Sequence, residues 1–304
     1  MTGKTRRQLT LGPLLYNWTA DRWSDFYARV ADEAPVDRVC LGEVVCSKRL
    51  PFYADRLPEA VERLRRAGKT VALSSLALVT LPRERQLAAE LAQDDTLEIE
   101  VNDLTLLATL PPGRRFAVGP LVNVYNEATL AYLAERGARH VCLPPELPLE
   151  SIAALAATQP PGTALEVWAF GRIPLAIASR CYHARVHGLT KDSCRFVCGE
   201  DPDGLTVETL DGDDFLAVNG VQTLSATYAS ALAHLTALTR AGVDSFRLSP
   251  HSIDMVAVAR LFRDVLEGEA EAPAAAVALA GLLPGAHFSA GFLHGPCGAA
   301  FGAA

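Results

Sequence analysis

Residues 57–79 read LPEAVERLRRAGKTVALSSLALV, a stretch that contains one complete repeat of the pattern that sets the fold. Residues 57–67 carry apolar positions at helical spacing between charged faces, and residues 70–79 form a short apolar run typical of a buried strand. Gly68 lies between them, where helices commonly end in a left-handed residue. The stretch therefore predicts a helix that leads directly into a strand.

The same alternation continues along the chain. Eight apolar runs predict strands at residues 9–15, 36–45, 70–79, 96–101, 115–124, 139–143, 164–170 and 243–248. Helices are predicted between them at residues 23–32, 57–67, 84–93, 127–136, 151–157, 225–240 and 255–266, and three further glycines occupy the position of Gly68: Gly137, Gly162 and Gly242. Parallel strands need crossover connections, which are usually helical. Eight such units favour a closed (β/α)8 TIM-like barrel over an open doubly wound sheet.

One interval departs from this alternation of strands and helices. About fifty residues, approximately 171–224, separate the seventh strand from the next predicted helix, and long irregular segments in compact domains are usually functional. We therefore predict a single barrel domain over residues 1–304, with this insertion after the seventh strand and a C-terminal tail at residues 270–304.

Composition narrows the classes of partner. The net charge is −7 and the chain has no long basic run, which argues against binding to nucleic acid or to an anionic membrane surface. The apolar residues 274–283 are too few to cross a bilayer, so no membrane span is expected. The basic start lacks a small-residue cleavage site, and the seven cysteines are an odd number. We expect reduced thiols and a cytoplasmic location.

Three of these cysteines, Cys181, Cys194 and Cys198, lie within the predicted insertion, and Cys46 lies one residue past the second predicted strand. Loops that follow barrel strands share one rim, so a four-thiolate site is geometrically reasonable. Four thiolates hold either a zinc ion or an iron–sulfur cluster. Structural zinc favours two close cysteine pairs, and this chain offers one, so the spacing favours the cluster without excluding zinc.

The insertion is also locally basic, which would stabilise an anionic cluster or would simply be a solvated loop surface: Arg172, Arg180, Arg185, Lys191 and Arg195. Cys40 and Cys142 stand in apolar runs and are expected to be core residues. Cys297 is expected to be a core or surface thiol.

Several segments together resemble the collagenase-like peptidase family of (β/α)8 proteins, and within it members that act in ubiquinone biosynthesis. These include LGPLLYNW at 11–18, LGEVVCSKR at 41–49, GRIPLAIASRCYHAR at 171–185, KDSCRFVC at 191–198 and FSAGFLHG at 288–295. The resemblance implies a [4Fe–4S] cluster held by Cys46, Cys181, Cys194 and Cys198, and oxygen-independent hydroxylation of ubiquinone precursors. It also implies a heterodimer with a UbiU-like sister subunit, and a lipid-binding accessory protein that presents the quinone precursor.

Glu43 and Arg247 are the candidates for catalytic residues, because they face a rim with few other charges. Peptidase activity has little support, since neither GxSxG nor HExxH occurs. His183 and His187 have the spacing of helical metal ligands, but Gly188 argues against a long helix there. A non-catalytic barrel that uses metal only to stabilise its insertion and bind a sister subunit remains the rival hypothesis.

Overall fold

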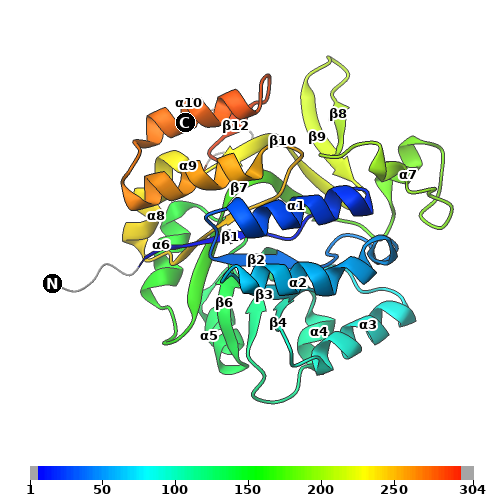
Figure 1. Ribbon diagram of the computed structural model, residues 1–304, viewed down its shortest axis with the longest axis horizontal. Coiled ribbons are helices and arrows are strands. Elements are labelled where there is room, and N and C mark those ends of the chain that lie inside the picture. Colours follow the sequence, from blue (N-terminus) through cyan, green and yellow to red (C-terminus); the bar gives the residue numbers. More distant parts are fainter. Residues whose placement is uncertain (1–5, 296–304) are drawn as a thin grey trace.

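Eight parallel strands close into a barrel in the computed structural model, which describes residues 6–295 (Figure 1). The strands are β1 (Gln8–Leu11), β2 (Arg38–Leu41), β3 (Thr70–Ser74), β4 (Glu98–Val101), β5 (Phe116–Val118), β6 (Ala138–Cys142), β7 (Ala164–Ile177) and β11 (Ser245–Leu248). β11 pairs in parallel with both β1 and β7, which closes the ring. The predicted (β/α)8 fold is confirmed.

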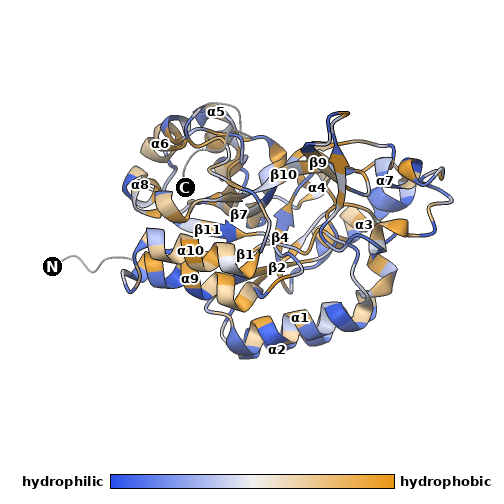
Figure 2. Ribbon diagram, turned by 90° about the horizontal axis from the view of Figure 1, so that it is seen from above, coloured by the Kyte–Doolittle hydropathy of each residue, from blue (hydrophilic) through white to orange (hydrophobic). Residues whose placement is uncertain are grey.

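Helices cover the outside of the barrel. They are α1 (Ala20–Glu33), α2 (Leu57–Arg66), α3 (Pro82–Gln93), α4 (Leu104–Thr109), α5 (Glu127–Glu135), α6 (Leu149–Ala157), α8 (Leu235–Ala241), α9 (Met255–Glu267) and α10 (Ala272–Leu282). Figure 2 shows hydrophilic and hydrophobic bands along α1 and α2. In α1 the buried residues Trp23, Tyr27 and Val30 recur at helical spacing, and the Thr19 side chain caps the first turn. Sequence reasoning missed α4, which is short, and α10, which lies in the predicted tail.

The glycines that suggested helix ends do have the backbone conformation that this role requires. Gly68 and Gly137 have φ angles of 79° and 116°. A Cβ atom at Gly137 would lie 2.3 Å from the Arg114 carbonyl oxygen, so a side chain there would collide with the backbone. The turn from α5 into β6 therefore depends on glycine.

The insertion differs from its prediction in one respect. β7 continues past Phe170 to Ile177 and leaves the barrel, where it pairs antiparallel with β10 (Gln222–Ser230); β9 (Asp214–Asn219) and β8 (Leu205–Glu208) extend this sheet. The helix predicted at 225–240 is therefore wrong over its first part. The apolar residues of this segment fit both the helical repeat of about 3.6 residues and the strand repeat of two. The free edge of β7 supplies backbone hydrogen-bond partners, which favour a strand. The helix begins at Leu235, after the 3-10 turn η5 (Leu232–His234).

Between β7 and β8 the insertion contains α7 (Tyr182–Val186) and the 3-10 turn η4 (Val197–Gly199), which lie beside β8 and β9 at one end of the molecule (Figure 1). Further 3-10 turns are η1 (Leu50–Phe52), η2 (Ala54–Arg56) and η3 (Pro120–Val122). The short strand β12 (Phe288–Ser289) pairs with β10. Over residues 6–295, every helix is too short or too polar to cross a membrane.

Candidate metal centre

The four cysteines predicted as ligands line one cavity of about 20 Å³, the thiol cavity. Cys46 lies in the loop after β2, and Cys181 is the residue that caps the start of α7. Cys194 lies in the loop before η4, and Cys198 lies in η4 itself. All four are free thiols. Residues separated by up to 152 positions in the sequence thus converge at the end of the barrel where β2 and β7 lead into their following segments.

The backbone between Cys194 and Cys198 has an unusual conformation. Arg195 and Phe196 have φ angles of 50° and 56°, in the left-handed region that side chains other than glycine rarely adopt. Two consecutive left-handed residues turn the chain sharply, so that both cysteines face the same cavity. Backbone strain of this kind persists where the surrounding structure holds it, and it concentrates at functional sites.

The Cys46 loop is held by Glu43. This buried carboxylate accepts hydrogen bonds from the backbone N–H groups of Val45 and Cys46, each at 2.9 Å, and from the Tyr53 hydroxyl at 3.2 Å. Burial raises the pKa of Glu43, while Arg49 and these hydrogen bonds lower it, with a net rise. Its visible contacts all fix the loop, which gives Glu43 a positioning role.

We expect Glu43→Ala to reduce the free energy of unfolding by about 1–3 kcal/mol, because two buried N–H groups lose their acceptor. Glu43→Gln keeps one oxygen facing both N–H groups and should recover most of that loss. Urea denaturation of the three proteins measures the difference. If Gln proved as harmful as Ala, the negative charge of Glu43, rather than its hydrogen bonds to the loop, would be what matters.

Nitrogen donors and cations surround the thiol cavity. Lys48 Nζ lies 3.5 Å from Cys194 Sγ and donates to the Lys191 carbonyl at 2.7 Å. Asn17 Nδ2 donates to Cys198 Sγ at 3.6 Å, and the backbone N–H of Ala184 donates to Cys181 Sγ at 3.4 Å. Buried Arg49 also lines the cavity. The surroundings thus offer positive charge and N–H groups to anionic sulfur.

The basic residues expected around the cysteines lie mostly on the surface of the insertion, in agreement with the alternative of a solvated loop. Lys191 lines the cavity, but Arg180, Arg185 and Arg195 are exposed, and Arg172 stacks over Tyr228, 4.6 Å from its ring centroid. Sequence reasoning missed Asn17, Lys48 and Arg49 as neighbours of the thiols. The motif CSKR at 46–49 was a usable signal, because it fixes two cations directly after a ligand.

The donor set fits a soft metal. Burial raises the pKa of the Cys46 and Cys181 thiols, and it outweighs the lowering by Arg49 at Cys46 and by the Ala184 N–H at Cys181. Free thiols at these positions therefore keep their protons at neutral pH, and a bound metal would displace them. Four sulfur ligands suit a tetrahedral zinc ion or an iron–sulfur cluster, so the chemistry of the site agrees with either group.

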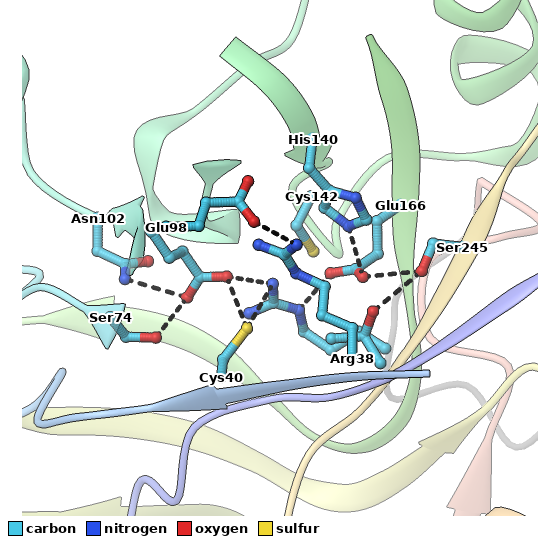
Figure 3. A network of polar contacts seen from close by, with 12 residues as sticks. Arg38, Cys40, Ser74, Glu98, Asn102, His140, Cys142, Glu166 and Ser245 are labelled. Carbon is cyan, nitrogen blue, oxygen red and sulfur yellow. Dashed lines mark hydrogen bonds and ion pairs between the residues drawn. The ribbon is translucent and has the colours of Figure 1, made fainter. Parts of the chain in front are cut away.

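The second candidate for a catalytic residue, Arg247, lies on β11 inside the barrel and is 1% exposed. Its guanidinium pairs with Glu100 on β4 and, through Nε at 2.5 Å, with Glu166 on β7. Ser74 and Asn102 donate to Glu100, while Ser245 donates to Glu166 and the His140 ring lies 2.8 Å from it (Figure 3). Arg247 joins β11 to both β4 and β7, which indicates a structural role for it.

Cys40 and Cys142 are fully buried, as expected of core residues. Their surroundings are nevertheless polar, since both appear in this network and Cys40 Sγ donates to Glu100 at 3.4 Å (Figure 3). Cys297 lies outside the described residues.

Two larger cavities adjoin the barrel. The mouth cavity, of about 280 Å³, lies between the loops that follow β5 and β6 and the outer part of β7, and its lining includes Asn123, Tyr125 and Glu146. The Tyr125 hydroxyl donates to Glu146, and burial together with this contact raises the pKa of Tyr125 to about 12. The side cavity, of about 160 Å³, is lined mainly by apolar residues from β3, α2 and α3, and Glu43 and Ser47 place it against the Cys46 loop.

Comparison with known protein families matches residues 22–297 to peptidase family U32. Among solved structures, an uncharacterised Bacillus cereus protein is 12% identical with a TM-score of 0.39, covering 86% of this chain, which in turn spans 64% of that protein. A tryptophan synthase α-subunit mutant from Pyrococcus furiosus is 13% identical with a TM-score of 0.25, covering 91% of this chain and 100% of the subunit. A putative dihydrodipicolinate synthase family protein from Coccidioides immitis is 12% identical with a TM-score of 0.23, covering 55% of this chain and 62% of that one.

Proposed function

The chain belongs to peptidase family U32, and from this premise we propose that it is a UbiV-like [4Fe–4S] subunit of an oxygen-independent hydroxylase in anaerobic ubiquinone biosynthesis. Cys46, Cys181, Cys194 and Cys198 would hold the cluster. The observation that carries the proposal is that these four thiols, drawn from two distant parts of the chain, line one cavity.

A cluster in this position would supply one-electron redox chemistry. The residues of this chain would tune that chemistry through charge and hydrogen bonding. Lys48 and Arg49 would offset the negative charge of four thiolates, and the Asn17 amide and Ala184 N–H would donate to ligand sulfur. The contacts of Glu43 to the Cys46 loop would hold the single ligand that comes from the barrel.

The substrate would be an aromatic quinone precursor with an apolar chain. The mouth cavity presents a mainly polar surface, to which Asn123, Tyr125 and Glu146 contribute, and this suits a ring that carries hydroxyl groups. The side cavity is apolar and borders the Cys46 loop, which suits part of an apolar chain. A lipid-binding accessory protein would present this substrate, and a UbiU-like sister subunit would complete a cytoplasmic heterodimer.

The rival proposal is a non-catalytic barrel in which the thiols hold zinc and stabilise the insertion for the sister subunit. One observation favours it: the thiol cavity measures about 20 Å³, close to the space needed by a single small group. Both proposals predict metal at the same cysteines and differ in its identity.

The test is anaerobic purification of the chain together with its sister subunit, followed by visible spectroscopy and by metal analysis. We expect a brown protein with iron and sulfide, and conversion of an unhydroxylated ubiquinone precursor when the accessory protein is present. A colourless protein with stoichiometric zinc would reject the cluster. A cluster-loaded pair that never hydroxylates the precursor would reject the reaction.

A further inference from the structure

A second group of metal-ligating side chains adjoins the thiol cavity, and one of its members, His183, also lines that cavity. His183 and His187 come from α7 and its end, and Asp201 comes from the segment between η4 and β8. One ligand atom from each of the three lies within 4.8 Å of the others. None of the three is needed by the cluster proposed above, so the group calls for its own explanation.

His183 has the geometry of a metal ligand. Its side chain is 0% exposed, and its Nδ1 atom lies 3.2 Å from the Val218 carbonyl oxygen on β9. A carbonyl only accepts hydrogen bonds, so Nδ1 carries the hydrogen and Nε2 presents a lone pair in the neutral ring. A backbone carbonyl in this position commonly orients a metal-bound histidine.

The Nε2 atom of His183 lies beside another acceptor without a hydrogen bond to it. Asp201 Oδ2 lies 2.9 Å from Nε2, yet Nε2 makes no hydrogen bond with any described residue. Two acceptor atoms at this distance repel each other unless positive charge lies between them. The His187 ring is stacked parallel to that of His183, with centroids 5.7 Å apart, and brings a third donor to the same point.

We propose that His183, His187 and Asp201 bind a divalent first-row transition-metal ion, separate from the group held by the four cysteines. Two imidazoles and a carboxylate are borderline ligands that suit zinc and its neighbours in the series. His187 is exposed and Asp201 partly exposed, which leaves an open side for water and for entry of the ion.

The ion would cross-link two segments of the insertion. It would join α7, which Cys181 caps, to the segment that directly follows Cys198, and Val218 would tie His183 to β9. Three cysteines of the thiol cavity lie on the segments that this ion would cross-link. Metal binding at the histidines would therefore order the insertion without contributing a ligand to the thiol cavity.

The experiment is an anaerobic Co²⁺ titration of the purified chain, followed by absorption spectroscopy. Cobalt bound by nitrogen and oxygen gives weak visible bands without the strong ultraviolet sulfur-to-cobalt band that thiolates produce. We expect such a nitrogen–oxygen site in the wild type, and an affinity at least about tenfold lower in His187→Ala and in Asp201→Asn. Glu200→Gln removes the neighbouring exposed carboxylate and should bind as the wild type does.

Limited trypsin digestion gives an independent readout, because Arg185 and Arg195 are exposed cleavage sites within the insertion. In protein whose thiol site is already occupied, added Zn²⁺ should slow cleavage there in the wild type and in Glu200→Gln, but not in Asp201→Asn. A wild type that shows only thiolate-bound cobalt would overturn the proposal, leaving His183 and Asp201 as an ion pair. Unchanged cobalt affinity in both ligand variants would overturn it as well.

Discussion

Cys46→Ala is expected to abolish iron binding by the chain. Cys46 is the one proposed ligand that comes from the barrel rather than the insertion, so its loss leaves three thiols without their anchor to β2. Iron content should fall from about four atoms per chain to a small remainder, and the visible absorbance of the cluster should disappear. Hydroxylation by the reconstituted pair should fall at least about tenfold, in line with the loss of activity that disturbed metal sites show.

The matched control is Cys142→Ala, which removes a fully buried thiol from β6 inside the barrel. That variant should bind iron at the wild-type level, because Cys142 lies outside the residues that line the thiol cavity. Equal iron content in Cys46→Ala and the wild type would contradict the four-thiolate site. Equal loss in both variants would point to a general folding defect instead.

The barrel could be predicted because its signals are local. Each strand followed by an amphipathic helix is encoded within one short stretch, and glycines such as Gly68 and Gly137 mark the helix ends by their own backbone conformation. The insertion is less local. Residues Gln222–Ser230 form a strand because β7 extends beyond the barrel and offers an edge for pairing. The sequence of those residues does not predict that β7 extends so far.

The candidate metal centre likewise has features that could be predicted from the sequence and features that could not. The four cysteines could be selected from spacing and from their positions after predicted strands, because a strand end determines which rim a loop joins. The direction of a side chain within a loop is not determined by spacing. Lys48 could be placed on this rim from its position after the second strand, but its contact with Cys194 Sγ could not be predicted, and neither could the exposure of the Arg180 side chain. Arg247 was expected at the rim and lies instead inside the barrel, since strand register decides which face a residue takes.

The second large effect is expected from Arg247→Met, which should lower the free energy of unfolding by about 3–5 kcal/mol. Arg247 is the shared partner of Glu100 and Glu166, both fully buried, and its removal leaves two carboxylates in the barrel interior without their cation. Methionine fills similar space, so the loss reports the uncompensated charge rather than a cavity. Urea denaturation at neutral pH measures the change.

The pH dependence of this variant separates the electrostatic explanation from a packing defect. Burial alone would raise the pKa values of Glu100 and Glu166, but Arg247 and the hydrogen-bond donors around each carboxylate together outweigh burial and hold both pKa values below the usual value. In the wild type, the stability contributed by these groups is therefore present above the ordinary glutamate pKa and is lost as the pH falls through the lower folded-state values.

Without Arg247 the sign should reverse. Burial then raises the folded-state pKa values of the two carboxylates above those of the unfolded chain, so the protonated form stabilises the fold and this contribution disappears as the pH rises. The stability difference between wild type and Arg247→Met should thus shrink on mild acidification. Adding Glu100→Gln to Arg247→Met should recover part of the loss at neutral pH, because one buried charge is then removed. A difference that is constant with pH and insensitive to Glu100→Gln would assign the effect to packing.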